Sequence, residues 1–366
     1  MRRKSKVVKV GEVEIGGSSL PVVQGMAKTD PLDVENIIDE IKALQKEGAK
    51  LVRIAVPNIK AARNISFIRE KVNLPLVADV HFNYRLALEA IDRGIDKVRI
   101  NPGNLSFKEI ALIAKKAKEN RIPLRVGVNS GSLPKELIKK ISNFKGKKEE
   151  RIRVIAEGMV DTALNCIRML EDEGFEDIVV SLKSSEIPVT ILSNKIIAEK
   201  IPYPIHLGIT ATGPPPEGII KSAIGIGALL SEGIGDTIRV SLTGTSVEEV
   251  RIAYKILKHL NIIDSGPVII TCPTCGRCRG DVEVIAQELL KVVEDIHFPI
   301  KIAVMGCEVN GPGEAMEADI GIACTKQGGV LFKKGRLLNK VKKDRILEAL
   351  VREINQMEKE LKENLK

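Results

Sequence analysis

The feature of this sequence that most constrains its fold is a regular alternation between short apolar runs and longer amphipathic stretches. Eight runs rich in β-branched residues, each ending in polar side chains, lie at residues 21–26, 51–56, 76–80, 97–101, 124–129, 177–182, 204–209 and 237–242. Helical periodicity fills intervals that include residues 33–47, 84–93, 107–120, 151–173, 218–231 and 247–260. Buried strands that alternate with helices predict a parallel sheet, and eight such units in roughly 260 residues match a TIM-type (β/α)8 barrel. A doubly wound open sheet is the alternative, but no glycine-rich dinucleotide turn follows the first run.

A domain boundary is predicted at the Asp-Ser-Gly-Pro segment 264–267. We expect residues 1–264 to form the barrel, which binds the substrate, and residues 265–366 to form a smaller α+β domain of about 100 residues. In the second domain the patterns predict strands near 268–271, 301–305, 319–324 and 329–333, and helices over 282–294 and from 344 onward.

Five basic residues lie near the ends of the barrel runs: Arg53, Arg99, Arg125, Lys183 and Arg239. The carboxyl ends of barrel strands form the active-site face, and cations gathered there without a ligand lose hydration and repel one another. Guanidinium groups bind phosphate oxygens in pairs, so the pattern predicts a diphosphate ligand. Further polar residues expected around this ligand are Asp79, His81, Asn129, His206, Thr210 and Ser241. Taken singly, an arginine can instead pair with a neighbouring acid, and His81 and His206 can be core histidines.

The formal net charge of +9 invites a nucleic-acid interpretation. The basic residues are scattered, however, and no RNA-binding aromatic motif or helix-turn-helix signature accompanies them. We therefore expect an anionic small-molecule substrate and an acidic electron carrier rather than nucleic acid. The basic N-terminus leads into no apolar signal region, and no apolar run approaches membrane-spanning length. These features predict a cytoplasmic protein with reduced thiols and no membrane partner.

Two segments carry the cysteines that point to a metal. Cys272, Cys275 and Cys278 lie in the segment TCPTCGRC, and Cys307 and Glu314 lie in the segment GCEVNGPGE, which we interpret as a loop. Thiolates are soft ligands that select iron–sulfur clusters, zinc or copper(I). The residues favour an iron–sulfur cluster, and a structural zinc site with four thiolates remains the alternative. Cys166 and Cys324 lie in apolar patterns and are expected to be core thiols.

The segments CPTCGR and VMGCEVNGPGEA resemble the cluster loops of the bacterial 4-hydroxy-3-methylbut-2-en-1-yl diphosphate synthase family, and the segment KSAIGIG is also similar to that family. The resemblance implies a [4Fe–4S] cluster held by Cys272, Cys275, Cys307 and Glu314. It also implies that the second domain is like the cluster domain of sulfite and nitrite reductases, and that the protein is a homodimer.

The implied activity belongs to the methylerythritol phosphate route to isoprenoids. It is the reductive opening and dehydration of 2-C-methyl-D-erythritol 2,4-cyclodiphosphate to 4-hydroxy-3-methylbut-2-enyl diphosphate. Two electrons reach the substrate through the cluster from a ferredoxin or a flavodoxin. We expect Glu314 to take part in catalysis because an all-cysteine cluster offers the substrate no exchangeable ligand position. We expect the donor to dock on basic residues near the cluster, including Arg277, Arg279 and residues 333–336.

The chain departs from the family pattern at several positions. Cys278 stands where the family usually has a residue that does not bind the cluster, and Ala211 stands where it ordinarily has glutamate. Gly25, Ala27 and Lys28 replace residues that are usually polar Ser, Thr and Asn. We expect Glu217, at the end of a proline-rich loop, to supply the missing acid, although it can equally be a solvated helix residue.

Three other functions remain open from the sequence. The first is a paralogous iron–sulfur reductase of a related diphosphate. The second is a barrel lyase or aldolase with a structural zinc domain, in which Lys183 is the base or the Schiff-base amine. The third is a nucleic-acid-binding protein with a zinc-ribbon tail.

Overall fold

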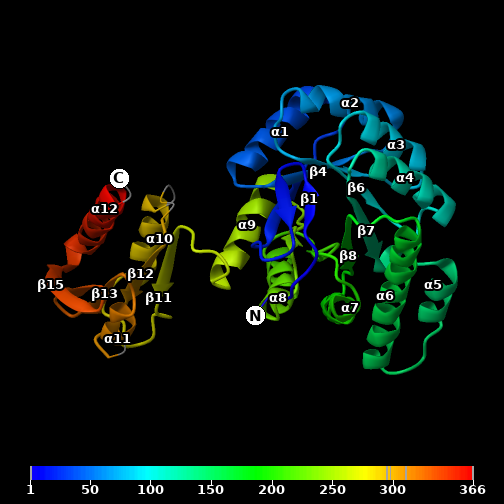
Figure 1. Cartoon of the computed structure of the whole chain (residues 1–366). Helices are drawn as coiled ribbons and strands as arrows, with labels where there is room; N and C mark the ends of the chain where they lie inside the picture. Colours follow the sequence, from blue (N-terminus) through cyan, green and yellow to red (C-terminus); the bar gives the residue numbers. More distant parts are fainter. Residues whose placement is uncertain (1, 294–295, 297, 310, 365–366) are drawn as a thin grey trace. The chain divides into compact units, whose positions relative to one another are not determined.

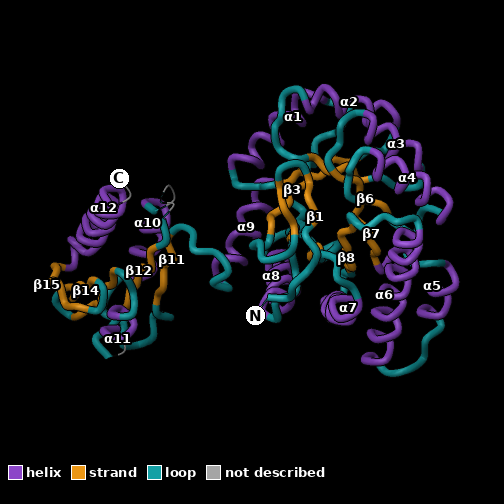
Figure 2. The backbone as a smooth tube through the Cα atoms, in the orientation of Figure 1, coloured by secondary structure: helices purple, strands orange, loops and turns teal. Residues whose placement is uncertain are grey.

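Eight parallel strands form a barrel in the first of two units, Met1–Ile262 and Ile263–Lys366. The computed structural model describes residues 2–293, 296, 298–309 and 311–364. The barrel strands are β3 (Val22–Met26), β4 (Leu51–Ala55), β5 (Leu76–Asp79), β6 (Lys97–Ile100), β7 (Leu124–Asn129), β8 (Ile178–Lys183), β9 (His206–Leu207) and β10 (Thr237–Ile238). They are ordered β8-β7-β6-β5-β4-β3-β10-β9, and a parallel bridge between Val180 and Ile205 joins the two outer strands. The predicted TIM-type barrel is confirmed (Figure 2).

Helices follow the barrel strands and surround them (Figure 1). They are α1 (Val34–Lys46), α2 (Ile59–Arg69), α3 (Tyr84–Asp92), α4 (Phe107–Glu119), α6 (Lys148–Asp172), α7 (Ile187–Lys200), α8 (Glu217–Ser231) and α9 (Ser246–His259), with the short α5 (Lys135–Ser142) before α6. Side chains of Asp33, Asn58 and Ser106 accept backbone amides in the first turns of α1, α2 and α4. Such caps satisfy amides that have no partner within the helix. Short polar residues therefore set where each helix begins, and so where each preceding loop ends.

The amino-terminal end of the barrel is closed by an antiparallel hairpin of β1 (Val8–Val10) and β2 (Val13–Ile15). Val10 and Ile15 are fully buried and pack with Leu51 and Val77 at the beginnings of β4 and β5. Because this end is filled by apolar side chains, the polar side chains of the strands gather toward the opposite, carboxyl end. That end is where barrel enzymes place their active sites.

The second unit is built on a five-stranded sheet. Its strands are β11 (Pro267–Thr271), β12 (Ile300–Met305), β13 (Ile320–Thr325), β14 (Gly328–Lys333) and β15 (Arg336–Lys342) in that spatial order. Strands β11, β12 and β13 pair in parallel, whereas β14 pairs antiparallel with both β13 and β15. Helices α10 (Val282–Val292) and α12 (Ile346–Asn364) pack against one face, and α11 (Gly311–Met316) packs against the other. Residue 294, at the expected end of α10, lies outside the described residues.

Two elements of this unit differ from the sequence interpretation. The segment around Glu314, interpreted as a loop, begins a short helix at Gly311. Strand β15 was not anticipated, because its pattern of exposed residues lacks the apolar alternation that marks a half-buried strand.

Asn310 of the GCEVNGPGE segment lies outside the described residues. No helix in the described part of the chain is long and apolar enough to cross a membrane.

Candidate active site and metal centre

The structure brings the five predicted cations together inside the barrel, close enough for all four arginines to repel the charge of Lys183. Asp79, at the end of β5, organises two of them. Its carboxylate lies 3.8 Å from Nε of Arg53 and 3.4 Å from Nη1 of Arg99. Nε2 of His81 lies 3.7 Å from the same carboxylate and 2.7 Å from Nη1 of Arg99. Four of the predicted residues therefore form one contact network.

The carboxyl of Asp79 stays ionised at neutral pH. Burial acts to raise its pKa, but Arg53, the hydrogen bond from His81, and Arg99 together hold the pKa well below its usual range. An ionised carboxylate between two guanidinium groups fixes their orientation. It neutralises only part of their charge, so Arg53 and Arg99 can still bind an anion.

Glu249 forms a second ion-pair network, which sequence reasoning missed. This buried carboxylate on α9 lies 2.9 Å from Nη2 of Arg239 and 2.9 Å from Nζ of Lys28. Nη1 of Arg239 also donates to Oγ of Ser241 at 2.8 Å. Glu249 stands on the buried face of α9 beside Val250 and Ala253. The sequence signal that could have revealed this network is an acidic residue on the apolar face of a predicted helix. Such an acid is expected to be buried, and a buried carboxylate usually has a cationic partner.

Deeper in the barrel, several buried donors have no partner. Among the described residues, the buried atoms without a hydrogen bond include Nε2 of Gln24, Nζ of Lys97, Nε of Arg125 and Nε2 of His206. Within the described part of the chain, the one hydrogen bond of the Arg125 side chain runs from Nη1 to Oε1 of Gln24, at 3.4 Å. Lys97 was not predicted, although it lies two residues before Arg99 on β6 and therefore on the same face of the strand.

The electrostatics of these groups show an excess of positive charge. Burial, followed by repulsion from Arg125 and Arg53, holds the pKa of Lys97 well below its usual value. Burial and the neighbouring cations lower the pKa of Lys183 and of His206 in the same way. Unpartnered buried donors are rare in folded proteins, and such an array is suited to an anion that supplies acceptors and negative charge.

The remaining predicted barrel residues lie at different depths along the barrel. Asn129 and Lys183 are direct neighbours on β7 and β8. Nδ1 of His206 lies 2.6 Å from Oγ1 of Thr237, so this histidine is held within the core. Lys183 and Lys97 also lie close enough to disfavour its protonated form. The amide of Thr210 donates to the carbonyl of Ser184 at 3.3 Å. Glu217 is exposed as the first residue of α8.

In the second unit, the predicted metal ligands line one cavity of about 370 Å³. Cys272 and Cys275 follow β11, Cys307 follows β12, and Glu314 projects from α11. Because β11 and β12 are adjacent and parallel, their carboxyl ends meet at the same edge of the sheet. The cavity is lined by Ile270, Thr271, Cys272, Pro273, Cys275, Arg277, Cys278, Met305, Gly306, Cys307, Gly311 and Glu314.

The backbone around the cavity approaches the sulfurs closely. The amide of Gly306 donates to Sγ of Cys272 at 3.1 Å, and a side chain at Gly306 would overlap Sγ of Cys278. Cys278 lines the same cavity, but its Sγ donates to the carbonyl of Gly280 at 3.1 Å. Cys324 is fully buried in β13, as expected, and burial raises its pKa to about 11. Cys166 is likewise buried within α6.

These donors suit an iron–sulfur cluster. Four thiols and a carboxylate around one cavity, with a backbone amide directed at a sulfur, match the ligand chemistry of such clusters. Among the described residues, no three His, Cys, Asp or Glu donors converge closely enough for a single metal ion.

The fold and these two sites define the chain as a (β/α)8-barrel enzyme with a separate, thiol-bearing α+β unit. Residues 5–254 match the family model of the GcpE TIM-barrel domain, and residues 268–356 match that of the GcpE protein C-terminal domain. The chain therefore belongs to the GcpE family, as the sequence motifs predicted.

Curated relatives match along nearly the whole chain. The chain is 51% identical to the 4-hydroxy-3-methylbut-2-en-1-yl diphosphate synthase (flavodoxin) of Clostridium acetobutylicum, over 97% of this chain and 99% of the relative. It is 49% identical to the protein of the same name from Caldanaerobacter subterraneus, over 98% of this chain and 99% of that one. Among solved structures, a dihydropteroate synthase from Coxiella burnetii covers 70% of this chain with a TM-score of 0.51 at 12% identity, which shows the barrel fold alone.

Proposed function

We propose that this chain is a 4-hydroxy-3-methylbut-2-en-1-yl diphosphate synthase. It opens the ring of 2-C-methyl-D-erythritol 2,4-cyclodiphosphate with two electrons, loses one hydroxyl as water, and releases 4-hydroxy-3-methylbut-2-enyl diphosphate. The observation that carries this proposal is the gathering of Cys272, Cys275, Cys307 and Glu314 around one cavity. The identity of about half to synthases over their full length supports it.

The barrel residues bind and orient the substrate. Arg53, Arg99, Arg125, Lys183 and Arg239 hold the diphosphate, and Asn129, Thr210 and Ser241 donate hydrogen bonds to it. Asp79 and Glu249 hold their arginine partners in place, while His81 and His206 complete the polar lining. The buried donors that have no protein partner gain acceptors when the diphosphate binds, so the anion reduces the cost of burying them.

Cys272, Cys275, Cys307 and Glu314 hold a [4Fe–4S] cluster. When bound, the cluster supplies electrons and a Lewis-acidic iron. The amide of Gly306 stabilises negative charge on the Cys272 sulfur. Glu314 is the one ligand of the cluster that is not a thiolate. Glu217 supplies a proton, because Ala211 stands where the family ordinarily has a glutamate.

The electron donor is an acidic flavodoxin, in keeping with the name of the relatives, with a ferredoxin as the alternative. The enzyme acts in the cytoplasm as a homodimer. Residues 1–264 carry the substrate, and residues 265–366 carry the cluster.

The test is anaerobic purification followed by turnover of the cyclodiphosphate with reduced flavodoxin. We expect a brown protein with about four irons per chain that forms the butenyl diphosphate. A colourless zinc protein would contradict the cluster assignment and favour the lyase. A fully loaded protein that is inactive on the cyclodiphosphate would instead favour a paralogous reductase, for which Ala211 is the motivating observation.

A further inference from the structure

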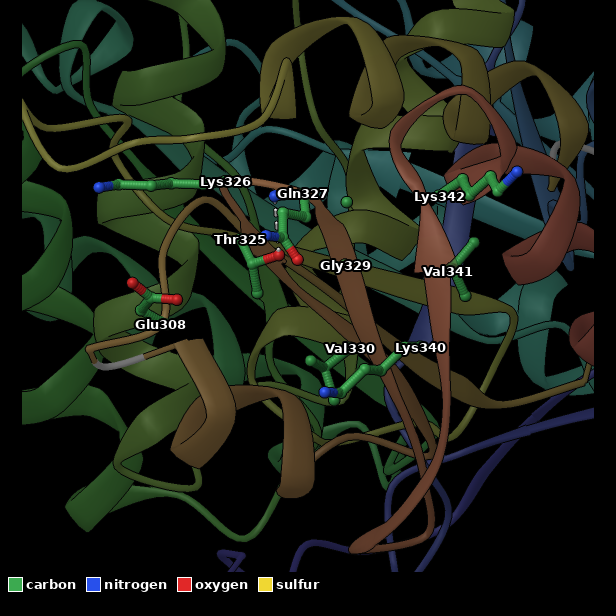
Figure 3. Close-up of a pocket in the computed structure, with 10 residues that line it drawn as sticks. Glu308, Thr325, Lys326, Gln327, Gly329, Val330, Lys340, Val341 and Lys342 are labelled. Carbon is green, nitrogen blue, oxygen red and sulfur yellow. Dashed lines mark hydrogen bonds between the residues drawn. The ribbon is translucent and has the colours of Figure 1, made fainter.

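A second, larger groove of about 530 Å³ lies in the cluster-bearing unit (Figure 3). Its walls come from the turn between β13 and β14, from β15, and from Glu308 in the loop after β12. The basic residues that line it are Lys326, Lys340 and Lys342. None of the residues predicted to bind the substrate or the cluster lines this groove.

The groove lies in a strongly basic part of a unit whose formal charges sum to zero. Residues 263–366 contain sixteen Lys and Arg and sixteen Asp and Glu. Eight of the sixteen basic residues fall within 326–345, where Asp344 is the one acid. The unit is therefore polarised, with its positive charge concentrated on β15 and the adjoining turns.

The three groove lysines are free to pair with a partner. All three are exposed, and within the described chain their side chains form no hydrogen bond or ion pair. Other basic residues of the same region are already paired. Nζ of Lys333 lies 3.3 Å from Glu353, and Nζ of Lys343 lies 3.4 Å from Asp281. Lys333, which we expected in the docking surface, is thus partly neutralised within the unit.

The groove borders the face of the sheet that α11 covers. Lys340 is the register partner of Val330, and paired residues of antiparallel strands share a face. Val330 packs with Met305 and Ala315, and Ala315 lies next to Glu314 in α11. Glu308, on the groove wall, directly follows Cys307. A molecule seated in the groove therefore lies one residue from a proposed cluster ligand.

The directions of the side chains indicate what kind of partner fits. Lys326 and Lys342 extend in opposite directions rather than toward a common point (Figure 3). A single phosphate needs convergent donors, whereas divergent cations over a broad groove are suited to an extended acidic surface.

We propose that the groove formed by Lys326, Lys340 and Lys342 is the docking surface for an acidic flavoprotein that delivers electrons to this unit. This inference rests on the proposed function, because it assumes a flavodoxin as donor. The proposal places the flavodoxin on the part of the unit where β15 and the turn between β13 and β14 form the groove. Complementary charge steers such an encounter, and its strength falls with ionic strength.

The test measures binding rather than turnover. The full chain, loaded anaerobically, is titrated with an oxidised bacterial flavodoxin of net negative charge by isothermal calorimetry at low and high salt. We expect the double variant Lys340→Glu with Lys342→Glu to raise the dissociation constant roughly tenfold or more at low salt. The difference in dissociation constant between this variant and the unaltered chain should shrink at high salt. Glu308→Gln should tighten binding, because it removes the acid from the groove wall.

The matched control is Lys291→Glu with Lys359→Glu, which changes the net charge by the same amount. These exposed residues lie on α10 and α12, whose buried sides pack against the other face of the sheet. Circular dichroism checks that each variant is folded, and Lys340→Gln with Lys342→Gln provides a milder pair. Reduction by dithionite should be unchanged in all variants, since a small reductant needs no docking surface.

The outcomes separate the two proposals. If flavodoxin binds the unaltered chain but the groove and control variants bind equally well, the groove is not the docking surface and the donor assignment stands. If flavodoxin does not bind the unaltered chain at any salt concentration, the donor assignment fails and the groove proposal fails with it.

Discussion

The amide nitrogen of Gly306 donates a hydrogen bond to Sγ of Cys272 across 3.1 Å. This contact joins the loop after β12 to the loop after β11, two segments that lie more than thirty residues apart in the chain. Hydrogen bonds to cluster sulfurs tune the reduction potential of iron–sulfur sites. The contact therefore links the shape of the backbone to the chemistry proposed for the second unit.

The first prediction concerns the thiol ligands. Serine in place of Cys272, Cys275 or Cys307 should each leave little intact cluster, because a neutral hydroxyl is a harder and weaker ligand for iron than a thiolate. Iron and sulfide content and visible absorbance measure the effect, and Cys166→Ser is the control. A variant at one of the three that keeps full iron, sulfide and activity would show that the ligand set is wrong.

The second prediction concerns the fourth ligand. Glu314→Ala should lose most of the cluster, whereas Cys278→Ala should keep it, because the Cys278 thiol already donates to the carbonyl of Gly280. Iron content and electron paramagnetic resonance of the reduced protein compare the two variants. The opposite pattern, with a cluster lost in Cys278→Ala and unaffected in Glu314→Ala, would assign the fourth position to Cys278.

The third prediction concerns the diphosphate. Arg125→Met and Arg239→Met should each weaken binding by about 1.5–3 kcal/mol, the range for a hydrogen bond to a charged group. Calorimetry with the cyclodiphosphate or with pyrophosphate on the unreduced chain measures this directly. Arg85→Met, at an exposed position on α3, is the control. Unchanged affinity in both test variants would exclude this pocket.

The fourth prediction concerns Lys97 in the anion-free protein. Its lowered pKa means that the unfolded chain carries a proton that the folded chain lacks, so stability should rise with pH up to the unfolded lysine pKa near 10.4. One such proton corresponds to a slope of about 1.4 kcal/mol per pH unit. Lys97→Met should reduce this slope at pH values below the unfolded lysine pKa.

Tyrosine fluorescence during urea unfolding is the measurement for Lys97. The chain has no Trp, and its three Tyr residues, Tyr84, Tyr203 and Tyr254, all lie in the barrel unit, so the signal follows that unit alone. The exposed Lys46→Met, on α1, is the control. An identical pH slope in Lys97→Met and the unaltered chain would contradict the prediction.

The fifth prediction concerns the proton donor. Glu217→Gln should slow turnover by roughly 10²–10⁴-fold, as expected for loss of a general acid, with cluster content and substrate affinity unchanged. Single-turnover kinetics with iron analysis separate these effects. Normal turnover would show that Glu217 is only an exposed first-turn helix residue.

The sequence by itself predicted the barrel and most of the proposed site. The alternation of apolar runs and helical stretches is a local pattern, and a barrel turns it directly into strands whose ends meet. Arg53, Arg99 and Arg125 therefore had to lie on strands of one barrel, with Arg99 and Arg125 side by side on β6 and β7. The spacing of Cys272 and Cys275 was equally local. Family motifs added Cys307 and Glu314, and the structure places both at the same cavity.

Other features were decided only by the tertiary structure, because they depend on contacts between segments that are distant in the sequence. Nothing local to Glu249 pairs it with both Arg239 and Lys28, and nothing local to Lys97 shows that its amine lies without an acceptor. The groove beside Glu308 exists because the unanticipated strand β15 pairs with β14. Hydrophobic periodicity, every second residue in a strand or every 3.6 residues in a helix, shows which side of an element is buried. Which side chains meet there depends on how the elements pack against one another.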